Sequence, residues 1–213
     1  MEIEIQDFVF ELLPQKAVWW RAKDTLLITD LHLGKILHFR KAGIALPQHA
    51  FEFNFRQLDA VLEASHPERI IFLGDLFHHQ VNEEWKYFQR WHARFMSLEM
   101  IAVLGNHDIL PVALFDEINI RRVPFLEEDG FLFRHHPIAE EKNHGPFTFC
   151  GHVHPMFQIQ SPTSHSLRLP CFVLESHQMI LPSFGLFTGG FTVQRKPGRQ
   201  IFIIADSLIF EIP

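Results

Sequence analysis

The segment from Thr25 to Lys35 constrains the fold of this chain most strongly. It begins Thr-Leu-Leu-Ile, an apolar run that predicts a short strand buried on both faces. The run ends at Asp30 and His32, which lie two positions apart and therefore point to the same side of an extended chain. Such a pair, at the end of a buried strand, can reach one cation. Taken alone, a capping aspartate and a loop histidine explain the pattern equally well.

The same kind of ending follows two further predicted strands. Arg69–Leu73 leads into Gly74-Asp75, and 99–104 leads into Gly105-Asn106-His107-Asp108. Apolar residues at helical spacing predict amphipathic helices over 48–63 and 83–98. Alternating strands and helices predict an α/β sheet, and in such sheets sites form outside the carboxyl ends of the strands.

Histidines also end two strands that are predicted later in the chain. The strand 129–134 leads into His135-His136-Pro137, and Phe147–Cys150 leads into Gly151-His152-Val153-His154. His152 and His154 repeat the spacing of Asp30 and His32. The remainder, from position 161, reads as short strands joined by glycine and proline turns. At the other end, two strands are predicted at 3–10 and 17–20, as a hairpin.

Composition bounds the class of protein. With 213 residues, 47% of them hydrophobic, the chain can form a large core, and we expect a single domain over residues 1–213. A net charge of −6 argues against a protein that coats polyanions in general. The acidic start lacks a secretory signal, and no apolar run approaches the roughly 20 residues of a membrane span. Cys150 and Cys171 are too few for a disulfide framework, so a cytoplasmic location is expected.

The candidate ligands exceed what one ion needs and suit two adjacent cations that share a carboxylate. Mixed imidazole, carboxylate and amide ligands fit manganese, iron or zinc better than calcium or magnesium. Two metals about 3.5–4 Å apart can clamp an in-line phosphoryl displacement, and each lowers the pKa of bound water. The candidate metal ligands are Asp30, His32, Asp75, Asn106, His135, His152 and His154.

These motifs, in this order, resemble the calcineurin-like metallophosphoesterase superfamily. The resemblance implies an α/β fold, an αββα sandwich of two mixed sheets flanked by helices, and phosphodiester hydrolysis by attack of a metal-bridging hydroxide. It also implies that Asp75 bridges the metals and that His107, with Asp108 behind it, is catalytic. In the family's His-x-Pro segment the first histidine is the ligand, which favours His135 over His136. The implied ligands are Asp30, His32 and His154 for one metal and Asn106, His135 and His152 for the other.

A narrower resemblance is carried by 30–35 with Phe39-Arg40, by 74–78, and by the tail Leu181-Pro182-x-Phe184-Gly185-x-Phe187-Thr188-Gly189-Gly190. These segments resemble the ligase-associated DNA damage response phosphoesterases and endonucleases called PdeM. The resemblance implies manganese as the metal, with iron or zinc possible, and a nucleic-acid substrate, DNA or RNA. It also implies association with a DNA ligase, a helicase and a nuclease, without a membrane.

Three questions stay open at the level of sequence. Lys35 and Arg40 read either as a solvated basic turn or as contacts to an anionic substrate. His78 and His79 read either as loop histidines or as groups that assist the site. The alternatives to a nuclease are a hydrolase of small phosphate esters and a non-catalytic module that binds the repair partners.

Overall fold

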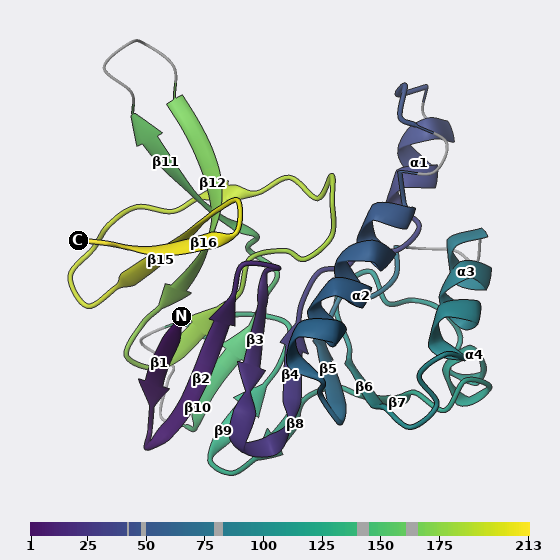
Figure 1. Cartoon of the computed structure of the whole chain (residues 1–213), viewed down its shortest axis with the longest axis horizontal. Helices are drawn as coiled ribbons and strands as arrows, with labels where there is room; N and C mark the ends of the chain where they lie inside the picture. The colour runs from purple at the N-terminus through teal and green to yellow at the C-terminus, as the bar shows by residue number, and fades with distance from the viewer. Residues whose placement is uncertain (42, 48–49, 79–82, 140–144, 161–165) are drawn as a thin grey trace.

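The chain folds into two packed β-sheets with helices along one of them (Figure 1). The computed structural model describes residues 1–41, 43–47, 50–78, 83–139, 145–160 and 166–213. Within these residues, one sheet has seven strands in the order β1-β2-β3-β4-β5-β6-β7. Its strands are β1 (Glu2–Ile5), β2 (Phe8–Leu13), β3 (Ala17–Trp20), β4 (Thr25–Ile28), β5 (Arg69–Leu73), β6 (Glu99–Val103) and β7 (Arg121–Val123).

This first sheet is mixed, and its parallel half carries the helices. Strands β1 to β4 pair antiparallel, whereas β4, β5, β6 and β7 pair parallel. Each parallel connection crosses over through a helix, as parallel pairing requires. The helices are α1 (Lys35–Lys41), α2 (Glu52–Ser65), α3 (Glu83–His92) and α4 (Val112–Asp116), and a short 3₁₀ turn, η1 (Arg21–Lys23), precedes β4.

The second sheet is also mixed and comes from the later part of the chain. Its order in the described residues is β14-β11-β12-β13-β10-β9-β8, and β15 pairs with both β12 and β16. Strands β11 and β12 form a long hairpin that projects from the molecule (Figure 1). The strands are β8 (Leu126–Glu128), β9 (Phe131–Phe133), β10 (Phe147–Cys150), β11 (Pro155–Gln160), β12 (Ser166–Leu174), β13 (Gln178–Ile180), β14 (Phe191–Thr192), β15 (Gln200–Ala205) and β16 (Leu208–Ile212).

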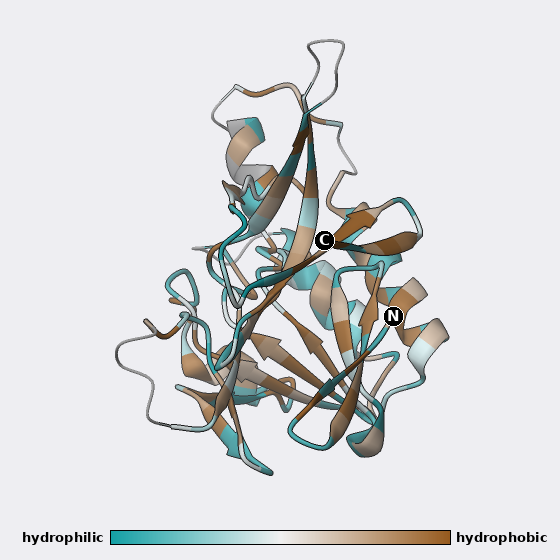
Figure 2. Cartoon of the chain, turned by 90° about the vertical axis from the view of Figure 1, so that its left-hand side faces the viewer, coloured by the Kyte–Doolittle hydropathy of each residue, from teal (hydrophilic) through white to brown (hydrophobic). Residues whose placement is uncertain are grey.

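Alternation along the central strands divides the apolar core into layers. In β5, Ile71 and Leu73 face the second sheet, while Ile70 and Phe72 face the helices. The layer between the sheets is rich in phenylalanine, and Figure 2 shows the hydrophobic colour concentrated on the strands. A smaller apolar cluster, which includes Cys150 and Cys171, lies on the other face of the second sheet. The two sheets are therefore joined by one continuous apolar layer.

The predicted fold class, a sandwich of two mixed sheets flanked by helices, is confirmed. One predicted strand is wrong: 3–10 is broken into β1 and β2 by a tight turn at Gln6 and Asp7, both of which have positive φ. The predicted helices 48–63 and 83–98 correspond to α2 and the shorter α3. No helix in the described ranges combines the length and apolarity that crossing a membrane demands.

Candidate active site

The loops that leave β4 and β5 run side by side beyond the ends of their strands. The Asp30 N–H donates to the Gly74 carbonyl (3.1 Å), and the His32 N–H donates to the Asp75 carbonyl (2.9 Å). The contact continues to Leu33, whose N–H donates to the Leu76 carbonyl (3.0 Å). Because strand pairing carries on into the loops, Asp30, His32 and Asp75 are fixed by backbone hydrogen bonds and not by side-chain packing alone.

The backbone at these positions is left-handed. Positive φ angles occur at 30, 32, 75, 152 and 154, with values between 50° and 70°. Aspartate and histidine enter this region more often than most residues, but it still costs free energy. Such outliers persist where the surrounding structure enforces them, and they cluster at functional sites. Here all five carry a carboxylate or an imidazole: Asp30, His32, Asp75, His152 and His154.

Two glycines leave room for these side chains. A Cβ on Gly74 would overlap the imidazole of His135, and Gly74 itself has a φ of +87°. A Cβ on Gly151 would overlap the Thr29 hydroxyl and the Asp30 carboxylate. The Gly-Asp and Gly-His pairs of the sequence therefore have a steric reason: the glycine lies where a neighbouring site side chain must fit.

Two buried carboxylates occupy the middle of an imidazole cluster. Asp30 Oδ1 lies 3.0 Å from His154 Nε2 and 3.8 Å from His32 Nε2. Asp75 Oδ2 lies 3.7 Å from His32 Nε2 and 3.4 Å from His135 Nε2. Asp75 therefore faces histidines from both sheets, since His32 follows β4 and His135 follows β9.

Backbone carbonyls orient two of these imidazoles. The Nδ1 of His135 lies 2.9 Å from the Leu73 carbonyl, and the Nδ1 of His154 lies 3.3 Å from the Thr188 carbonyl. A carbonyl can only accept, so in each ring Nδ1 carries a proton, and Nε2 is the nitrogen that remains available to a metal. Both Nε2 atoms point toward the carboxylates, an arrangement typical of metal-ligating histidines.

The imidazoles of His136 and His152 adjoin this cluster next to His135. His152 Nδ1 lies 3.2 Å from His135 Nε2. The His136 ring lies edge-on to that of His135 (centroids 4.9 Å apart) and tilted to that of His152 (4.5 Å). His135 is buried, whereas His136 is exposed. Of the two candidates in the His-x-Pro segment, His135 is thus the one in contact with Asp75.

The donor atoms meet the requirements of a metal site. Three groups have ligand atoms within 4.8 Å of one another: Asp30, His32 and His154; Asp30, Asp75 and His135; and His135, His136 and His152. Within the described residues, Asp30 Oδ1 and both ring nitrogens of His32 are buried without a hydrogen-bond partner. Buried polar atoms are normally paired, so these atoms require a cation or another partner. Carboxylate and imidazole donors together fit a divalent transition metal.

The electrostatics favour the protonation states that ligands need. Burial, with a contribution from Lys35, lowers the pKa of His32 to about 3, so this imidazole is neutral at pH 7. Burial raises the pKa of Asp75, but the hydrogen bond and the charge of His135 outweigh it, and the net pKa is lowered. The pKa of Asp30 is also lowered because His154 and His135 outweigh its burial. Both carboxylates are therefore ionised in the folded protein.

The loop after β6 brings the predicted catalytic residues to the same place. The His107 N–H donates to Asp75 Oδ1 (2.8 Å), and the His107 ring lies 5.4 Å from that of His32, centroid to centroid. Asp108 accepts hydrogen bonds from the Phe77 N–H (3.0 Å) and the Gly105 N–H (2.9 Å), so its carboxylate joins two loops. Asn106 lies between Gly105 and His107 in the same loop and is exposed.

The predicted basic contacts differ in position. Lys35 begins α1, and its Nζ lies 3.4 Å from the Thr188 carbonyl, beside the cluster. Burial lowers the pKa of Lys35, while the nearby Asp30 and Asp75 oppose that shift. Arg40 lies near the far end of α1 and is exposed. His78 approaches the cluster, with its ring centroid 4.6 Å from that of His107. His79 lies outside the described residues.

Sequence reasoning missed the groups that orient the ligands. The Thr29 hydroxyl donates to Asp30 Oδ2 (2.8 Å), and the His152 N–H donates to the same oxygen (2.9 Å). The carbonyls of Leu73 and Thr188 orient His135 and His154. Only Thr29 carries a signal in the sequence, as a hydroxyl beside the aspartate at a strand end. The backbone carbonyls and N–H groups leave no signal in the sequence, because every residue carries them.

This fold and this cluster define a metallophosphoesterase. The sequence profile of the calcineurin-like phosphoesterase family matches residues 24–180, which include all seven predicted metal ligands. The chain belongs to the calcineurin-like phosphoesterase family, and it is a metal-dependent phosphoesterase. The resemblance stated from the motifs is thereby confirmed.

Solved structures extend the comparison. The crystal structure of Pseudomonas putida nuclease MPE is similar over 100% of this chain and 99% of its own, with 28% identity and a TM-score of 0.80. The E. coli phosphoesterase Yfce is similar over 88% of this chain and 97% of its own, with 15% identity and a TM-score of 0.47. The comparison with curated proteins returned no match. The likeness to a nuclease is consistent with the PdeM resemblance.

Proposed function

We propose that this chain is a single-domain phosphodiesterase that uses two divalent metal ions and acts on nucleic acid. The observation that carries the proposal is the position of Asp75. Its Oδ2 lies 3.7 Å from His32 Nε2 and 3.4 Å from His135 Nε2, and these histidines follow strands of different sheets. A carboxylate that adjoins ligands from both sheets is suited to bridge two cations.

Two metals would be held by separate sets of these ligand atoms, with Asp75 common to both. In this proposal Asp30, His32 and His154 bind one metal, and their donor atoms form one of the compact groups. His135, His152 and Asn106 would bind the other, and the exposed Asn106 is proposed from its place after β6 and from the family resemblance. Manganese is the proposed metal because the PdeM resemblance implies it, and iron or zinc are alternatives that the mixture of imidazole and oxygen donors also fits.

The bound metals would supply Lewis acidity toward the phosphoryl oxygens and a lowered pKa for water. The remaining roles belong to side chains of this chain. His107, whose backbone N–H donates to Asp75, is proposed to give a proton to the leaving oxygen. Asp108 positions that loop through its two backbone contacts. Lys35 lies beside the cluster and is proposed to contact a substrate phosphate, with Arg40 further along α1.

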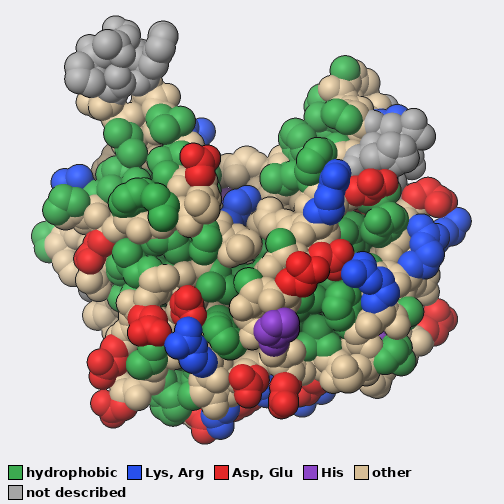
Figure 3. Space-filling model, in the orientation of Figure 1, with side chains coloured by type: hydrophobic (Ala, Val, Ile, Leu, Met, Phe, Trp, Pro, Cys, Tyr) green, Lys and Arg blue, Asp and Glu red, His purple; other side chains and the backbone are tan. Residues whose placement is uncertain are grey.

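Two observations support a nucleic-acid substrate. The chain resembles a nuclease over its whole length at 28% identity. The site also lies between two projecting parts, since residues 29–34 lead from β4 into α1 and His154 leads into the β11–β12 hairpin. Figure 3 shows the molecule hollowed between these projections. A hollow of this kind gives an extended phosphodiester access to the cluster.

The cellular setting is part of the same proposal. Cys150 and Cys171 are both buried free thiols, which supports a reducing compartment such as the cytoplasm. Association with a DNA ligase, a helicase and a nuclease rests on the family resemblance.

Chelated protein, with manganese, zinc, magnesium or no metal added back, tests the proposal. We expect metal-dependent hydrolysis of bis(p-nitrophenyl) phosphate in preference to p-nitrophenyl phosphate, followed by cleavage of DNA or RNA. A preference for the monoester would reassign the chain to small phosphate esters. Inactivity of folded protein with every metal would favour a module that only binds partners.

A further inference from the structure

A cavity of about 190 Å³ adjoins the cluster of aspartate and histidine side chains, and His154 of that cluster is part of its lining. Nε2 of that ring lies 3.0 Å from Asp30, while Nδ1 faces the Thr188 carbonyl, and both His154 and Thr188 line the cavity. His154 therefore borders both the cavity and the cluster. A ligand that reached both places would extend around the edge of His154.

The walls of the cavity are mainly apolar. They come from the start of β11, from β12, and from residues 182–189, which connect β13 to β14. The connecting segment is fixed at both sides: the Leu186 N–H donates to Asn54 Oδ1 on α2 (3.0 Å), and the Phe191 N–H donates to the His154 carbonyl (3.0 Å). The apolar lining residues are Pro155, Met156, Pro170, Pro182, Leu186 and Phe187.

Lys16 is the charged side chain in this lining, and its ammonium group can donate further hydrogen bonds. It lies at the β2–β3 turn, is partly buried, and donates from Nζ to the Phe184 carbonyl at 3.4 Å. An ammonium group has three donors, and within the described part of the chain this one long hydrogen bond engages only one of them. Burial lowers the pKa of Lys16, which reflects how little water reaches it. The cavity is therefore suited to a ligand that brings a hydrogen-bond acceptor.

Phe187 provides an aromatic wall in a strained conformation. Its φ is +60°, which is a genuine outlier for a bulky residue, and its side chain is 45% exposed. Strain and exposure of an aromatic side chain both cost free energy, so a position that has both, next to a catalytic cluster, suggests a role in binding. A flat aromatic ligand stacks on such a ring.

We propose that this cavity binds one nucleobase of the substrate, stacked on Phe187 and hydrogen-bonded by Lys16, which positions the adjoining phosphate at the metal cluster. The proposal rests on the nucleic-acid substrate proposed above. A base is flat, largely apolar on its faces and rich in acceptors at its edge, as these walls require. A phosphate group fits less well, because proline, methionine and leucine walls offer an anion no compensation for its lost hydration.

Binding to chelated protein tests the proposal without cleavage. Fluorescence anisotropy would compare a labelled oligothymidylate with an abasic phosphodiester chain of the same length and charge. For the unaltered protein we expect about tenfold tighter binding of the oligothymidylate, the size that stacking of a base on an aromatic side chain supports. Lys16→Met and Phe187→Ala are each expected to remove most of that preference while leaving the affinity for the abasic chain unchanged.

Matched variants control for charge and for exposed apolar area. Lys86→Met removes an exposed lysine on α3 that pairs with Glu83, and Phe210→Ala removes a phenylalanine that is 47% exposed on β16. Both are expected to keep the tenfold preference. Equal weakening of both oligomers by Lys16→Met would place Lys16 on a phosphate and overturn the proposal, as would an unchanged preference in both cavity variants. A base-dependent affinity in a protein that cuts no nucleic acid with any metal would refute the proposed function and leave the cavity proposal standing.

Discussion

At the scale of single residues, Asp75 is where the two halves of the cluster meet. We expect Asp75→Asn to lose bound metal and to lower turnover by about 10²-fold or more, because loss of the shared negative charge leaves two cations repelling each other. Oδ1 accepts the His107 N–H, a contact that an amide oxygen can keep, so the loop need not collapse. Metal content by elemental analysis and turnover of a diester substrate measure the two effects.

Asp206→Asn is the matched control for that variant. Asp206 lies in the β15–β16 turn, outside the cluster, with a positive φ that asparagine also tolerates. It is expected to retain both metal and turnover. Full metal content in Asp75→Asn would contradict a bridging role.

His107 makes a different prediction because it contacts the cluster through its backbone. The hydrogen bond to Asp75 comes from the His107 N–H, which survives in His107→Ala. We therefore expect turnover to fall by about 10²-fold, the low end of what general acid–base catalysis contributes, with metal content unchanged. Steady-state kinetics with metal analysis on the same sample checks both. Unaltered kcat in the variant would remove His107 from the mechanism.

The identities of the ligands could be predicted from the sequence, whereas their conformations could not. Asp30, His32 and His154 were recognisable because the i, i+2 spacing at strand ends places both side chains on one side. Their left-handed backbone could not be inferred, because it depends on pairing between loops that are distant in sequence. The role of Asp108 was predicted as support for His107, but its two acceptors are occupied by amides of Phe77 and Gly105, which no local pattern encodes.

At the scale of elements, Asp108 joins the loops that follow β5 and β6. Removing its carboxylate would leave two N–H groups without their acceptors, at about 1–3 kcal/mol each where buried. We expect Asp108→Ala to lower the melting temperature by several degrees, since about 1 kcal/mol corresponds to about 2–4 °C in a domain of this size. Asp108→Asn keeps one acceptor oxygen, and its melting temperature is expected to lie between those of Asp108→Ala and the unaltered protein. A melting temperature equal to that of the unaltered protein would show that the loops do not depend on this link.

Elements with a clear period were predicted well, and short or irregular ones were not. Strands β4, β5, β6 and β10 were anticipated because each is a compact apolar run. Helix α1 was not predicted, because its seven residues are too few to show a helical period, and its Lys35 and Arg40 were read either as a basic turn or as substrate contacts. The division of 3–10 into β1 and β2 depends on the left-handed turn at Gln6 and Asp7, which lacks the glycine that marks such turns.

Glu175 connects β12, β13 and the segment before β15. Burial raises its pKa, but hydrogen bonds from Gln178, Arg199 and Lys196 outweigh this and lower the pKa to about 2. Because the folded pKa lies below the unfolded one, the unfolded chain binds more protons at acidic pH. The stabilisation is complete above about pH 4.5 and is lost as the pH falls toward 2, with an upper limit of about 3 kcal/mol.

Glu175→Gln tests this linkage. We expect the variant to be less stable than the unaltered protein near neutral pH, and the difference to shrink as the pH falls below about 4.5. Urea unfolding across this range measures both free energies. Glu63→Gln, an exposed change on α2, is the control and is expected to leave the pH dependence as it was. A difference that stays constant with pH would assign Glu175 to packing and not to its charge.

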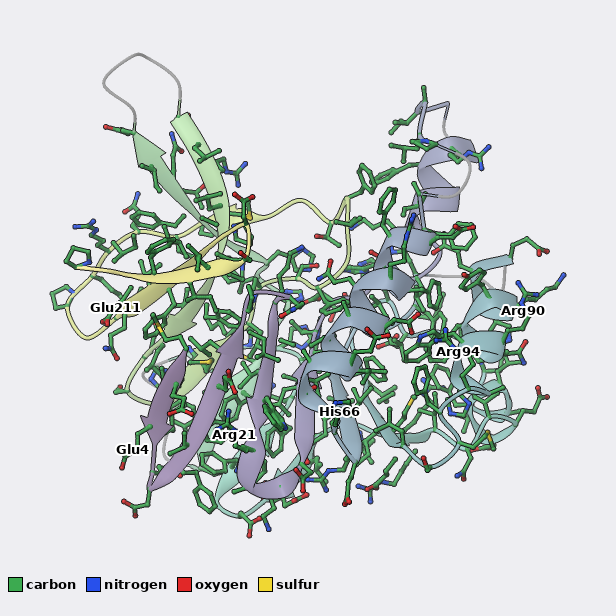
Figure 4. All side chains as sticks on the ribbon, in the orientation of Figure 1. Glu4, Arg21, His66, Arg90, Arg94 and Glu211 are labelled. Atoms are coloured by element: carbon green, nitrogen blue, oxygen red, sulfur yellow. The ribbon has the colours of Figure 1, made fainter. Side chains whose placement is uncertain are left out.

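At the scale of the whole molecule, the cluster lies at one end of the sandwich, where both sheets contribute. Asp30, His32 and Asp75 follow strands of the first sheet, and His135, His152 and His154 follow or precede strands of the second. The opposite end of the molecule can be located in Figure 4 by His66, which is labelled where α2 ends, away from α1. The apolar layer joins the sheets along their length, but at the cluster end the contact is made by polar side chains.

Metal binding is therefore expected to stabilise the whole sandwich and not only the site. Metal held by residues of both sheets is lost on unfolding, so free metal at about 100 times its dissociation constant adds about 2.7 kcal/mol to the unfolding free energy. In a domain of this size that corresponds to a rise of roughly 5–10 °C in melting temperature. Scanning calorimetry of chelated protein, with and without manganese, measures the shift. Asp75→Asn is expected to lose most of it, whereas His107→Ala keeps it. A melting temperature that does not respond to manganese, zinc or magnesium would contradict metal binding across the two sheets, independently of any activity assay.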